Sequence, residues 1–217
     1  MKKHGFTLAE ILVTLGIIGV VAALVMPTFV QSTQNAKVGP RLAKAVAMFE
    51  QANQAILSDE EADSLAGAGV ISNTTNYFAT LAEHLKGAAT DVAVPADGQT
   101  GDPTIAGFVM PDGTAIVIPE GEGDLFTNAV GEFAHQRRVS NCVMIDINGS
   151  AGPNRPARDR FYFYMMDDGS LQPYGGAQEN ERDRWTRRCA KNSTPAGDDR
   201  RYCTGHVLEN GLKVEYK

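Results

Sequence analysis

Cysteine and histidine, the residues that most often bind zinc in proteins, are scarce in this chain and are not grouped. Three cysteines and four histidines occur among 217 residues. No Cys-x-x-Cys pair is present and the histidines lie far apart, which excludes the common zinc motifs. Three cysteines are also few for a disulfide scaffold. A hydrophobic content of 43% is enough for one membrane segment and one modest globular domain.

A catalytic group of residues is also missing. His4, His84, His135 and His206 have no Ser or Cys partner at the spacing of known nucleophile motifs. We therefore predict that the protein is not an enzyme and expect no certain cofactor. The opposing hypothesis is an exported enzyme tethered by an N-terminal stem, which a hydrolase screen on the ectodomain would test.

Charge is absent from a long segment near the N-terminus. No Asp, Glu, Lys or Arg occurs from Ile11 to Ala36, and Ile11–Met26 is almost purely apolar. About twenty such residues in a helix span the hydrocarbon core of a bilayer, which is roughly 30 Å thick. Lys2 and Lys3 precede the segment and favour a cytoplasmic N-terminus. The sequence therefore predicts a single membrane-spanning helix.

Three interpretations of this segment compete. A secretory signal peptide could be cut near Val21-Ala22-Ala23, but the apolar stretch is long for that role. A plain membrane anchor accounts for length and orientation, but not for Glu10 at the edge of the apolar run. The third interpretation uses the order of the residues: a basic leader ends at Gly5, and Phe6-Thr7-Leu8-Ala9-Glu10 leads into the apolar run.

This order resembles the class III signal of type IV prepilins and type II secretion pseudopilins. The resemblance implies that a prepilin peptidase cuts after Gly5 on the cytoplasmic side, and that Phe6 is then N-methylated. It also implies that an inner-membrane assembly platform and further pilin or pseudopilin subunits, identical or different, are partners. The subunit would lie in the bacterial inner membrane before assembly, and in a periplasmic or cell-surface filament afterwards.

Glu10 is the residue of this segment with the most specific expected role. A carboxylate costs about 2.5 kcal/mol or more near the bilayer centre unless it is paired. The resemblance implies that Glu10 of an incoming subunit neutralises the Phe6 amine of a subunit already in the filament. The alternative is a carboxylate in the first helical turn that complements the helix dipole, worth about 0.3–1 kcal/mol. The two roles are compatible.

The helix is expected to continue well beyond the membrane. Leu42, Val46, Phe49, Ala52, Asn53 and Ile56 recur on one helical face. Pro27 should kink or locally unwind the helix, and Gly39-Pro40 should bend or restart it. We predict a leader at 1–5, a transmembrane or filament-core helix at 6–30, an amphipathic helix at 31–57 and a globular head at 58–217.

The sequence of the head predicts one short helix and several β-hairpins. A short helix is expected over Asn76–Leu85, and loops over Glu60–Gly69 and Asp91–Pro103. Strands are expected at Ile105–Met110, Ala115–Ile118, Cys142–Ile147, Phe161–Met165, His206–Leu208 and Lys213–Tyr216, with a turn at Pro111-Asp112-Gly113. The fold class is therefore α+β, a long N-terminal helix packed on an antiparallel sheet. The pilin fold implied by the resemblance has the same composition.

Cysteines and charges suggest how the head is closed and how it meets neighbours. Cys189 and Cys203 enclose a loop-like segment, and a disulfide there would contribute roughly 3 kcal/mol. Cys142 lies in an apolar run and is expected to be a buried free thiol. From Glu50 to Glu132 the net charge is −13, and from Arg137 to Arg201 it is +3. Opposite faces of neighbouring copies could attract, or both faces could simply be solvated.

A polar loop offers hard oxygen ligands at Asp146, Asn148, Asn154 and Asp159. Calcium takes about six to eight such oxygens, although the spacing does not fit an EF-hand. The stretch resembles a segment of one pilin-like subgroup, and several pseudopilins bind calcium in a loop of the head. The alternative, which we favour, is a network of Asx turns in which these side chains cap their own backbone.

An arginine cluster occupies the last third of the chain and could contact DNA phosphates. Its members are Arg155, Arg158, Arg160, Arg182, Arg184, Arg187 and Arg188. Acids are interleaved at Asp159, Glu179, Glu181 and Asp183, so ion pairs within or between subunits are favoured over DNA binding. Trp185 and Tyr174 are expected to pack within the domain.

The residues and the resemblance together predict a structural subunit of a type IV pilus-like filament. It would be processed by prepilin peptidase and assembled through its N-terminal helix. The alternative is a pseudopilin of a type II secretion system or a subunit of a competence pseudopilus, because all three use the same stem. A disulfide loop favours the pilus, and a calcium loop would favour the pseudopilus.

Overall fold

The computed structural model describes residues 7–72, 74–85, 87–95, 104–118, 139–149, 151, 154–174, 189, 203–209 and 211. The chain divides into two compact units, Met1–Lys37 and Val38–Lys217. The leader, Gly5 and Phe6 lie outside the described residues.

A single helix, α1, runs over Leu8–Asp59 and contains both prolines. It ends one or two residues beyond the predicted end. The chain does not begin a new helix at Pro40, in contrast to one of the two outcomes expected there. Burial explains why the helix continues, since Val38 and Leu42 on either side of Pro40 both lie in the hydrophobic core, and packing stabilises most helices in proteins. A kink at Pro27 or Pro40 stays a prediction.

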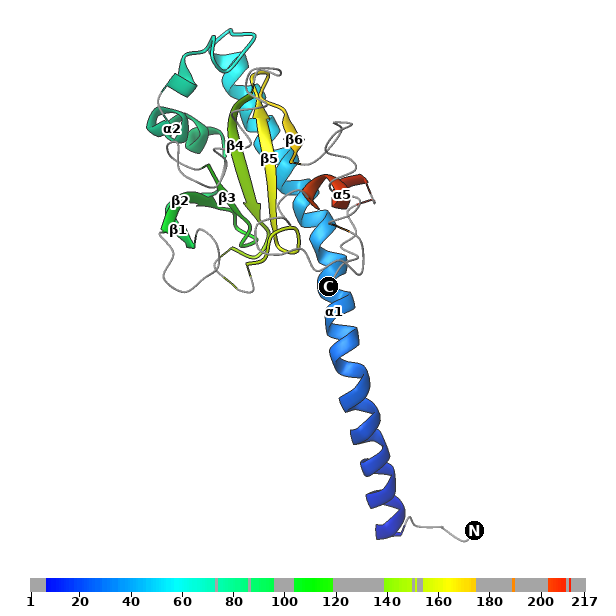
Figure 1. Cartoon of the computed structure of the whole chain (residues 1–217). Helices are drawn as coiled ribbons and strands as arrows, with labels where there is room; N and C mark the ends of the chain where they lie inside the picture. Colours follow the sequence, from blue (N-terminus) through cyan, green and yellow to red (C-terminus); the bar gives the residue numbers. More distant parts are fainter. Residues whose placement is uncertain are drawn as a thin grey trace, which may run out of the picture. The chain divides into compact units, whose positions relative to one another are not determined.

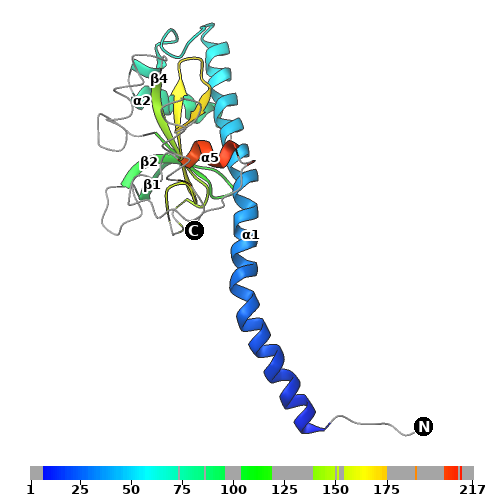
Figure 2. The same ribbon diagram turned by 45° about the vertical axis from the view of Figure 1, so that its right-hand side comes forward.

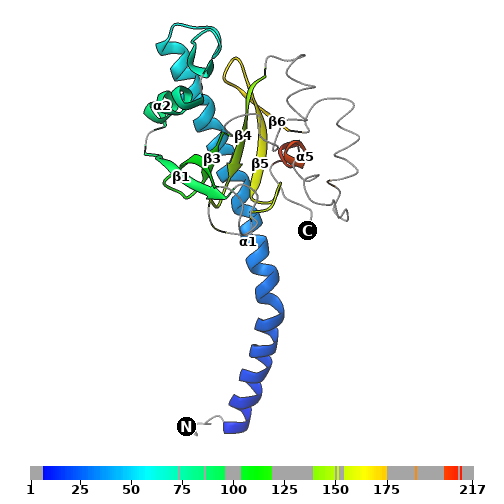
Figure 3. The ribbon, with the colours of Figure 1, turned by 60° about the vertical axis from the view of Figure 1, so that its left-hand side comes forward.

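The second unit contains one antiparallel sheet whose strand order is the chain order, from β1 to β6 (Figures 1 and 3). The strands are β1 Ala89–Pro95, β2 Thr104–Val109, β3 Ala115–Val117, β4 Val139–Asp146, β5 Arg160–Met166 and β6 Leu171–Pro173. The four strands predicted between Ile105 and Met165 are confirmed as β2 to β5, with the predicted turn at Pro111-Asp112-Gly113. The α+β fold class is confirmed.

Two segments differ from the prediction, and one strand was not predicted. Residues 91–95, expected as loop, belong to β1, where Pro95 ends a strand on the sheet edge, a position that proline tolerates. His206–Leu208, expected as a strand, lies in helix α5 (Cys203–Glu209), whose first residues are buried against the sheet. β6 is too short to give a periodic signal. The predicted Lys213–Tyr216 strand lies outside the described residues.

One face of the sheet packs on α1 and on helix α2 (Thr74–His84), beside the 3-10 turn η1 (Val70–Ser72). The predicted apolar face of α1 is confirmed: Leu42, Phe49, Ala52, Asn53 and Ile56 are buried, and Val46 packs against them. From α2, Tyr77 and Leu81 are buried in the same core, together with Leu85 just after the helix. Figure 2 shows the length of α1 that belongs to the second unit beside the sheet.

The opposite face of the sheet carries a second buried cluster. It consists of Ala115, Val117, Cys142, Met144, Tyr162, Tyr164 and Tyr174. Successive residues of a strand point to opposite faces, and Val143 and Ile145 accordingly belong to the α1 side whereas Cys142 and Met144 belong to this one. Both faces of β4 and β5 are therefore buried.

Polar side chains of α1 hold the turn between β5 and β6. Glu50 Oε1 accepts a hydrogen bond from Leu171 N, Asn53 Nδ2 donates to Gly169 O, and Gln54 Nε2 donates to Asp168 O. Asn53 Oδ1 also accepts from the Tyr77 hydroxyl at 2.6 Å, which adds α2 to the same connection. The turn is therefore held by residues i, i+3 and i+4 of one helix, which lie on the same side of it.

Gly169 lies so close to Asn53 of α1 that a side chain at this position should destabilise the fold. Its φ is +81°, and a Cβ there would lie 2.7 Å from Asn53 Cβ; Gly113 has φ +85° but open space around it. Both Gly→Ala changes carry the left-handed strain of about 1 kcal/mol, and Gly169→Ala adds an overpacking cost of about 1–3 kcal/mol. Urea unfolding of the detergent-solubilised chain, followed by near-ultraviolet dichroism, should show this difference. Equal losses in the two variants would contradict the close approach.

Candidate functional site

The N-terminal part of α1 is not buried by the part of the chain that the structure describes. Leu8–Met26 is a 19-residue segment of mean hydropathy 2.5, none of it buried, and is long and apolar enough to cross a membrane. At 1.5 Å per residue its length is about 28 Å, close to the thickness of the hydrocarbon core. Leu24, for example, is 72% exposed. Exposed apolar surface of this extent requires a lipid or protein environment.

The helix begins with a capping box formed by Thr7 and Glu10. Glu10 Oε2 accepts hydrogen bonds from the Thr7 backbone N and from the Thr7 hydroxyl, both at 2.8 Å. The Glu10 backbone N donates in return to Thr7 Oγ1 at 3.3 Å. This reciprocal arrangement satisfies donors that the first turn of a helix leaves open. The carboxylate thus takes the helix-end position expected for it.

The two oxygens of Glu10 are not equivalent. Both hydrogen bonds of the cap go to Oε2, and Oε1 accepts none in the part of the chain that the structure describes. The pairing of Glu10 with the Phe6 amine of a neighbour stays a prediction, because Gly5 and Phe6 lie outside the described residues. The geometry leaves one oxygen available for it.

Thr14 and two glycines are the next polar and small residues of the segment. The Thr14 side chain is hydrogen-bonded within the helix, whereas the space beside Gly16 and Gly19 is open. The Thr14 hydroxyl donates to the carbonyls of Glu10 and Ile11, so that it needs no outside partner in an apolar environment. A Cβ added at Gly16 or Gly19 would meet no atom within 4 Å. Each glycine costs a helix about 1 kcal/mol relative to Ala, and nothing in the described chain requires either one.

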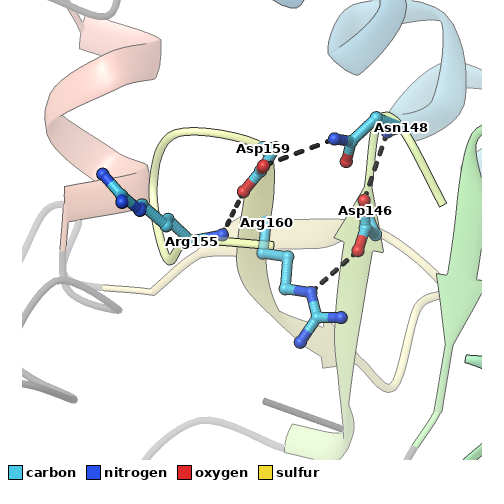
Figure 4. A network of polar contacts seen from close by, with 5 residues as sticks. All are labelled: Asp146, Asn148, Arg155, Asp159 and Arg160. Carbon is cyan, nitrogen blue, oxygen red and sulfur yellow. Dashed lines mark hydrogen bonds and ion pairs between the residues drawn. The ribbon is translucent and has the colours of Figure 1, made fainter. Parts of the chain in front are cut away.

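Three of the four residues of the expected calcium loop, Asp146, Asn148 and Asp159, form an internal network with Arg155 and Arg160 at the neighbouring ends of β4 and β5 (Figure 4). Arg160 Nε donates to Asp146 Oδ2 at 2.7 Å, and both side chains are fully buried. Asn148 N donates to Asp146 Oδ1, Asn148 Nδ2 donates to Asp159 Oδ2 at 3.4 Å, and Arg155 N donates to Asp159 Oδ1. Asn154 is buried beside them with φ +50°.

Every carboxylate oxygen of this network already accepts a hydrogen bond. Burial raises the pKa of Asp146 to about 6, while the Arg160 ion pair acts in the opposite direction; burial also raises the pKa of Asp159. Calcium needs about six to eight oxygens, and the described residues contain no group of three or more His, Cys, Asp or Glu side chains able to hold a metal. As arranged, the donors fit the Asx-turn network rather than calcium, whose binding stays a prediction.

The cysteines pair as predicted. Cys189 and Cys203 form a disulfide that holds the start of α5, and Cys142 is a buried free thiol. Burial raises the pKa of Cys142 to about 12, so the thiol is neutral and unreactive in the folded state. Thr204 follows the disulfide, and its Oγ1 accepts from Tyr162 N at 2.9 Å. The disulfide thereby places α5 against β5.

The three arginines of the cluster that the structure describes have different surroundings. Arg160 is buried in its ion pair and cannot reach a phosphate, whereas Arg155 is exposed and Arg158 is half-buried. Arg182, Arg184, Arg187, Arg188 and Trp185 lie outside the described residues.

Sequence reasoning missed two functional contacts. The role of Thr7 could have been found from its Thr-x-x-Glu spacing to Glu10, which is that of a capping box. The Asp146–Arg160 pair has no such local signal, because it depends on the register that sets these two residues opposite each other in β4 and β5.

The buried ion pair makes a quantitative prediction. Asp146→Ala should lower the free energy of unfolding at pH 7.5 by about 3–5 kcal/mol, because it leaves the Arg160 cation buried without a counter-charge. The matched control is Asp63→Ala, an exposed position without a side-chain contact in the described part, for which about 0.5 kcal/mol or less is expected. Urea unfolding measures both. Similar small losses in the two variants would show that the pair is not essential.

Comparison with known proteins gives one match, and it falls on the capped apolar helix. No curated protein and no solved structure matches the chain. Residues 1–26 match the family model described as the prokaryotic N-terminal methylation motif. The chain therefore carries at its N-terminus the prepilin leader of type IV pilins and pseudopilins, as the order of residues from Gly5 to Glu10 indicated.

Proposed function

We propose that this protein is a structural subunit of a type IV pilus, made as a prepilin and assembled through its N-terminal helix. The observation that carries the proposal is the fully exposed apolar segment Leu8–Met26, capped by Thr7 and Glu10 within the methylation motif. The motif supports a type IV pilin-like or pseudopilin protein that is processed by prepilin peptidase and anchored in a membrane before assembly.

The precursor uses the segment as a membrane anchor. Lys2 and Lys3 hold the N-terminus in the cytoplasm, so the head lies on the other side of the inner membrane. Cleavage after Gly5 removes both lysines and gives Phe6 a cationic amine four residues before Glu10. The mature N-terminus can leave the bilayer together with its helix. This is possible because the positive charge of the Phe6 amine and the negative charge of Glu10 can neutralise each other.

Assembly then pairs these charges between subunits. Glu10 Oε2 is held by Thr7 and Oε1 accepts no hydrogen bond from a described residue, so the carboxylate can keep its cap while it accepts a hydrogen bond from the Phe6 amine of a neighbour. In an apolar bundle an unpaired charge costs several kcal/mol. A subunit docked in any other register would leave both charges unpaired, which fixes the axial position. Thr7 acts here as the residue that positions Glu10.

A pseudopilin of a type II secretion system, or a competence pseudopilus subunit, is the alternative function. These filaments use the same stem, so the N-terminal helix does not separate them. The Cys189–Cys203 disulfide favours a surface-exposed fibre, which benefits from a covalent connection in its head. Calcium binding in the head would favour a pseudopilin. This argument is weaker, because Asp146 and Asp159 already accept hydrogen bonds from Arg160 and Arg155. The pilus is therefore preferred.

Processing gives the first prediction of this proposal. The mature chain should begin at N-methylated Phe6 and contain 212 of the 217 residues. Intact-mass analysis of membrane and filament fractions measures this directly. Gly5→Arg should abolish processing, because a large charged side chain cannot occupy the cleavage position. A mature start near Leu24 would instead indicate ordinary signal peptidase and contradict the proposal.

Two substitutions of Glu10 separate its cap from its charge. Glu10→Gln keeps an acceptor for Thr7 but loses the charge, and Glu10→Ala loses both. If charge pairing directs docking, both variants should be processed and inserted normally but yield filaments reduced by about tenfold or more, the effect of losing about 1.4 kcal/mol or more. Quantification of subunit in sheared and membrane fractions measures the yield. Normal filaments from Glu10→Gln would leave Glu10 as a helix cap alone.

The identity of the filament is tested by shearing cells and identifying the dominant protein of the released fibres. If the chain is a pilus subunit, it should be recovered in sheared surface fibres, and its deletion should remove or shorten them. Retention in the envelope, with loss of enzyme export on deletion and intact surface fibres, would favour the pseudopilus.

A further inference from the structure

Among the described residues of the second unit, carboxylates gather at one end. The end of α1 and the adjoining β5–β6 turn carry six carboxylates: Asp59, Glu60, Glu61, Asp63, Asp167 and Asp168. The two segments meet there, since Leu65 N donates to Asp167 O and Ala66 N donates to Asp167 Oδ1. These carboxylates therefore form one surface, which we call the acidic end.

The acidic end is not balanced within the described residues. The C-terminus of a helix carries partial negative charge, so acids at the end of α1 are unfavourable there. Within the described ranges Asp59, Glu60, Glu61, Asp63 and Asp168 form no ion pair with Lys or Arg, and His84 Nε2 lies 3.8 Å from Asp59 Oδ2. Between the helix and the turn lies an open polar groove, lined by Gln54, Ser58, Asp63 and Asp168 among others.

The opposite end of β5 carries two arginines that form no ion pair with a described residue. Arg155 is exposed, Arg158 is half-exposed, and neither forms an ion pair with a described residue. In Figure 4 the Arg155 side chain extends away from the polar network, to which it contributes only its backbone N–H. The acids nearby are engaged, Asp146 by Arg160 and Asp159 by backbone and amide groups. This loop is the basic end of the same unit.

The two ends are separated by the length of one strand. β5 runs over Arg160–Met166, so the arginine loop directly precedes it and the Asp167–Asp168 turn directly follows it. Seven residues of strand extend about 20 Å. Copies that repeat along the strand direction in one orientation bring the basic end of each copy to the acidic end of the next. Such a head-to-tail contact does not close on itself and continues as a filament.

We propose that the head contacts a second copy of this chain through these two ends, with Arg155 and Arg158 of one copy against the acidic end of the next. The polar groove at Asp63 and Asp168 has the charge to receive an arginine side chain. This inference rests on the proposed function and adds to it a second contact, distinct from the apolar helix. Complementary charge of this kind sets partner and register more than it adds affinity.

Charge reversal with restoration tests the contact in the full chain. Glu60→Lys/Asp63→Lys and Arg155→Glu/Arg158→Glu should each lower the filament yield by about tenfold, since like charges then face each other. The combined fourfold variant should return the yield to near that of the wild type. The control Glu209→Lys changes an exposed acid of α5, which belongs to neither end, and should have no effect.

A cross-link provides a readout that does not depend on reversed charges. Asp63→Cys/Arg158→Cys should give disulfide-linked dimers and longer ladders in filaments, whereas either single change should not. Normal yield from both reversed pairs, or no gain in the fourfold variant together with no cross-link, would overturn the contact. In that case a filament defect in Glu10→Gln would leave the proposed function standing. Absence of filaments from the wild-type chain would overturn both.

Discussion

Burial of one face of α1 against the sheet is the interaction on which the rest of the head depends. From Val38 to Leu57 the helix places its apolar residues in a single core with α2 and the inner faces of β2 to β5. Because that packing fixes the rotation of the helix, the polar residues at its borders are fixed as well. Glu50, Asn53 and Gln54 then reach the β5–β6 turn, and Lys44 reaches Asp112 at 2.9 Å in the β2–β3 turn. Arg41 donates to the carbonyl of Ile147 at the end of β4. One buried stripe thus positions three turns of the sheet.

The two parts of α1 have surfaces that suit two different environments. Up to Met26 its surface is apolar on all sides, which suits lipid or a bundle of identical helices, and from Val38 it is amphipathic and belongs to the head. The few polar atoms of the first part are satisfied locally, through the Thr7–Glu10 cap and the Thr14 hydroxyl. Within the described residues, the second oxygen of Glu10 accepts no hydrogen bond. The family motif covers residues 1–26 and therefore coincides with this first part of the chain.

Much of the fold could be predicted from the sequence where a pattern is long or chemically distinctive. The periodicity from Leu42 to Ile56, the Pro111-Asp112-Gly113 turn and the alternation in β4 and β5 each specify a structure without tertiary information. Short elements could not be predicted. β6 has three residues, and α5 depends on a disulfide and on the contact of Thr204 with Tyr162. Pro and Asp in Asp91–Pro95 indicated a loop, although Val92 and Val94 pair with β2. The Asp146–Arg160 pair follows from strand register, which a sequence pattern does not contain, whereas the Thr7 cap follows from local spacing.

The order of the strands in the sheet has a consequence for how the head is made. Each strand pairs with the strand that precedes it in the chain, from β1 to β6, so no strand has to wait for a distant one before it can pair. Short sequence separation between partners favours rapid folding. A chain that crosses a membrane with its N-terminus anchored delivers these strands one after another. Each new strand then meets an edge already formed beside α1, and Cys203, which joins Cys189 near the C-terminus, arrives last. Both cysteines of this bond follow β6 in the chain, so the bond can form only after the six described strands have emerged.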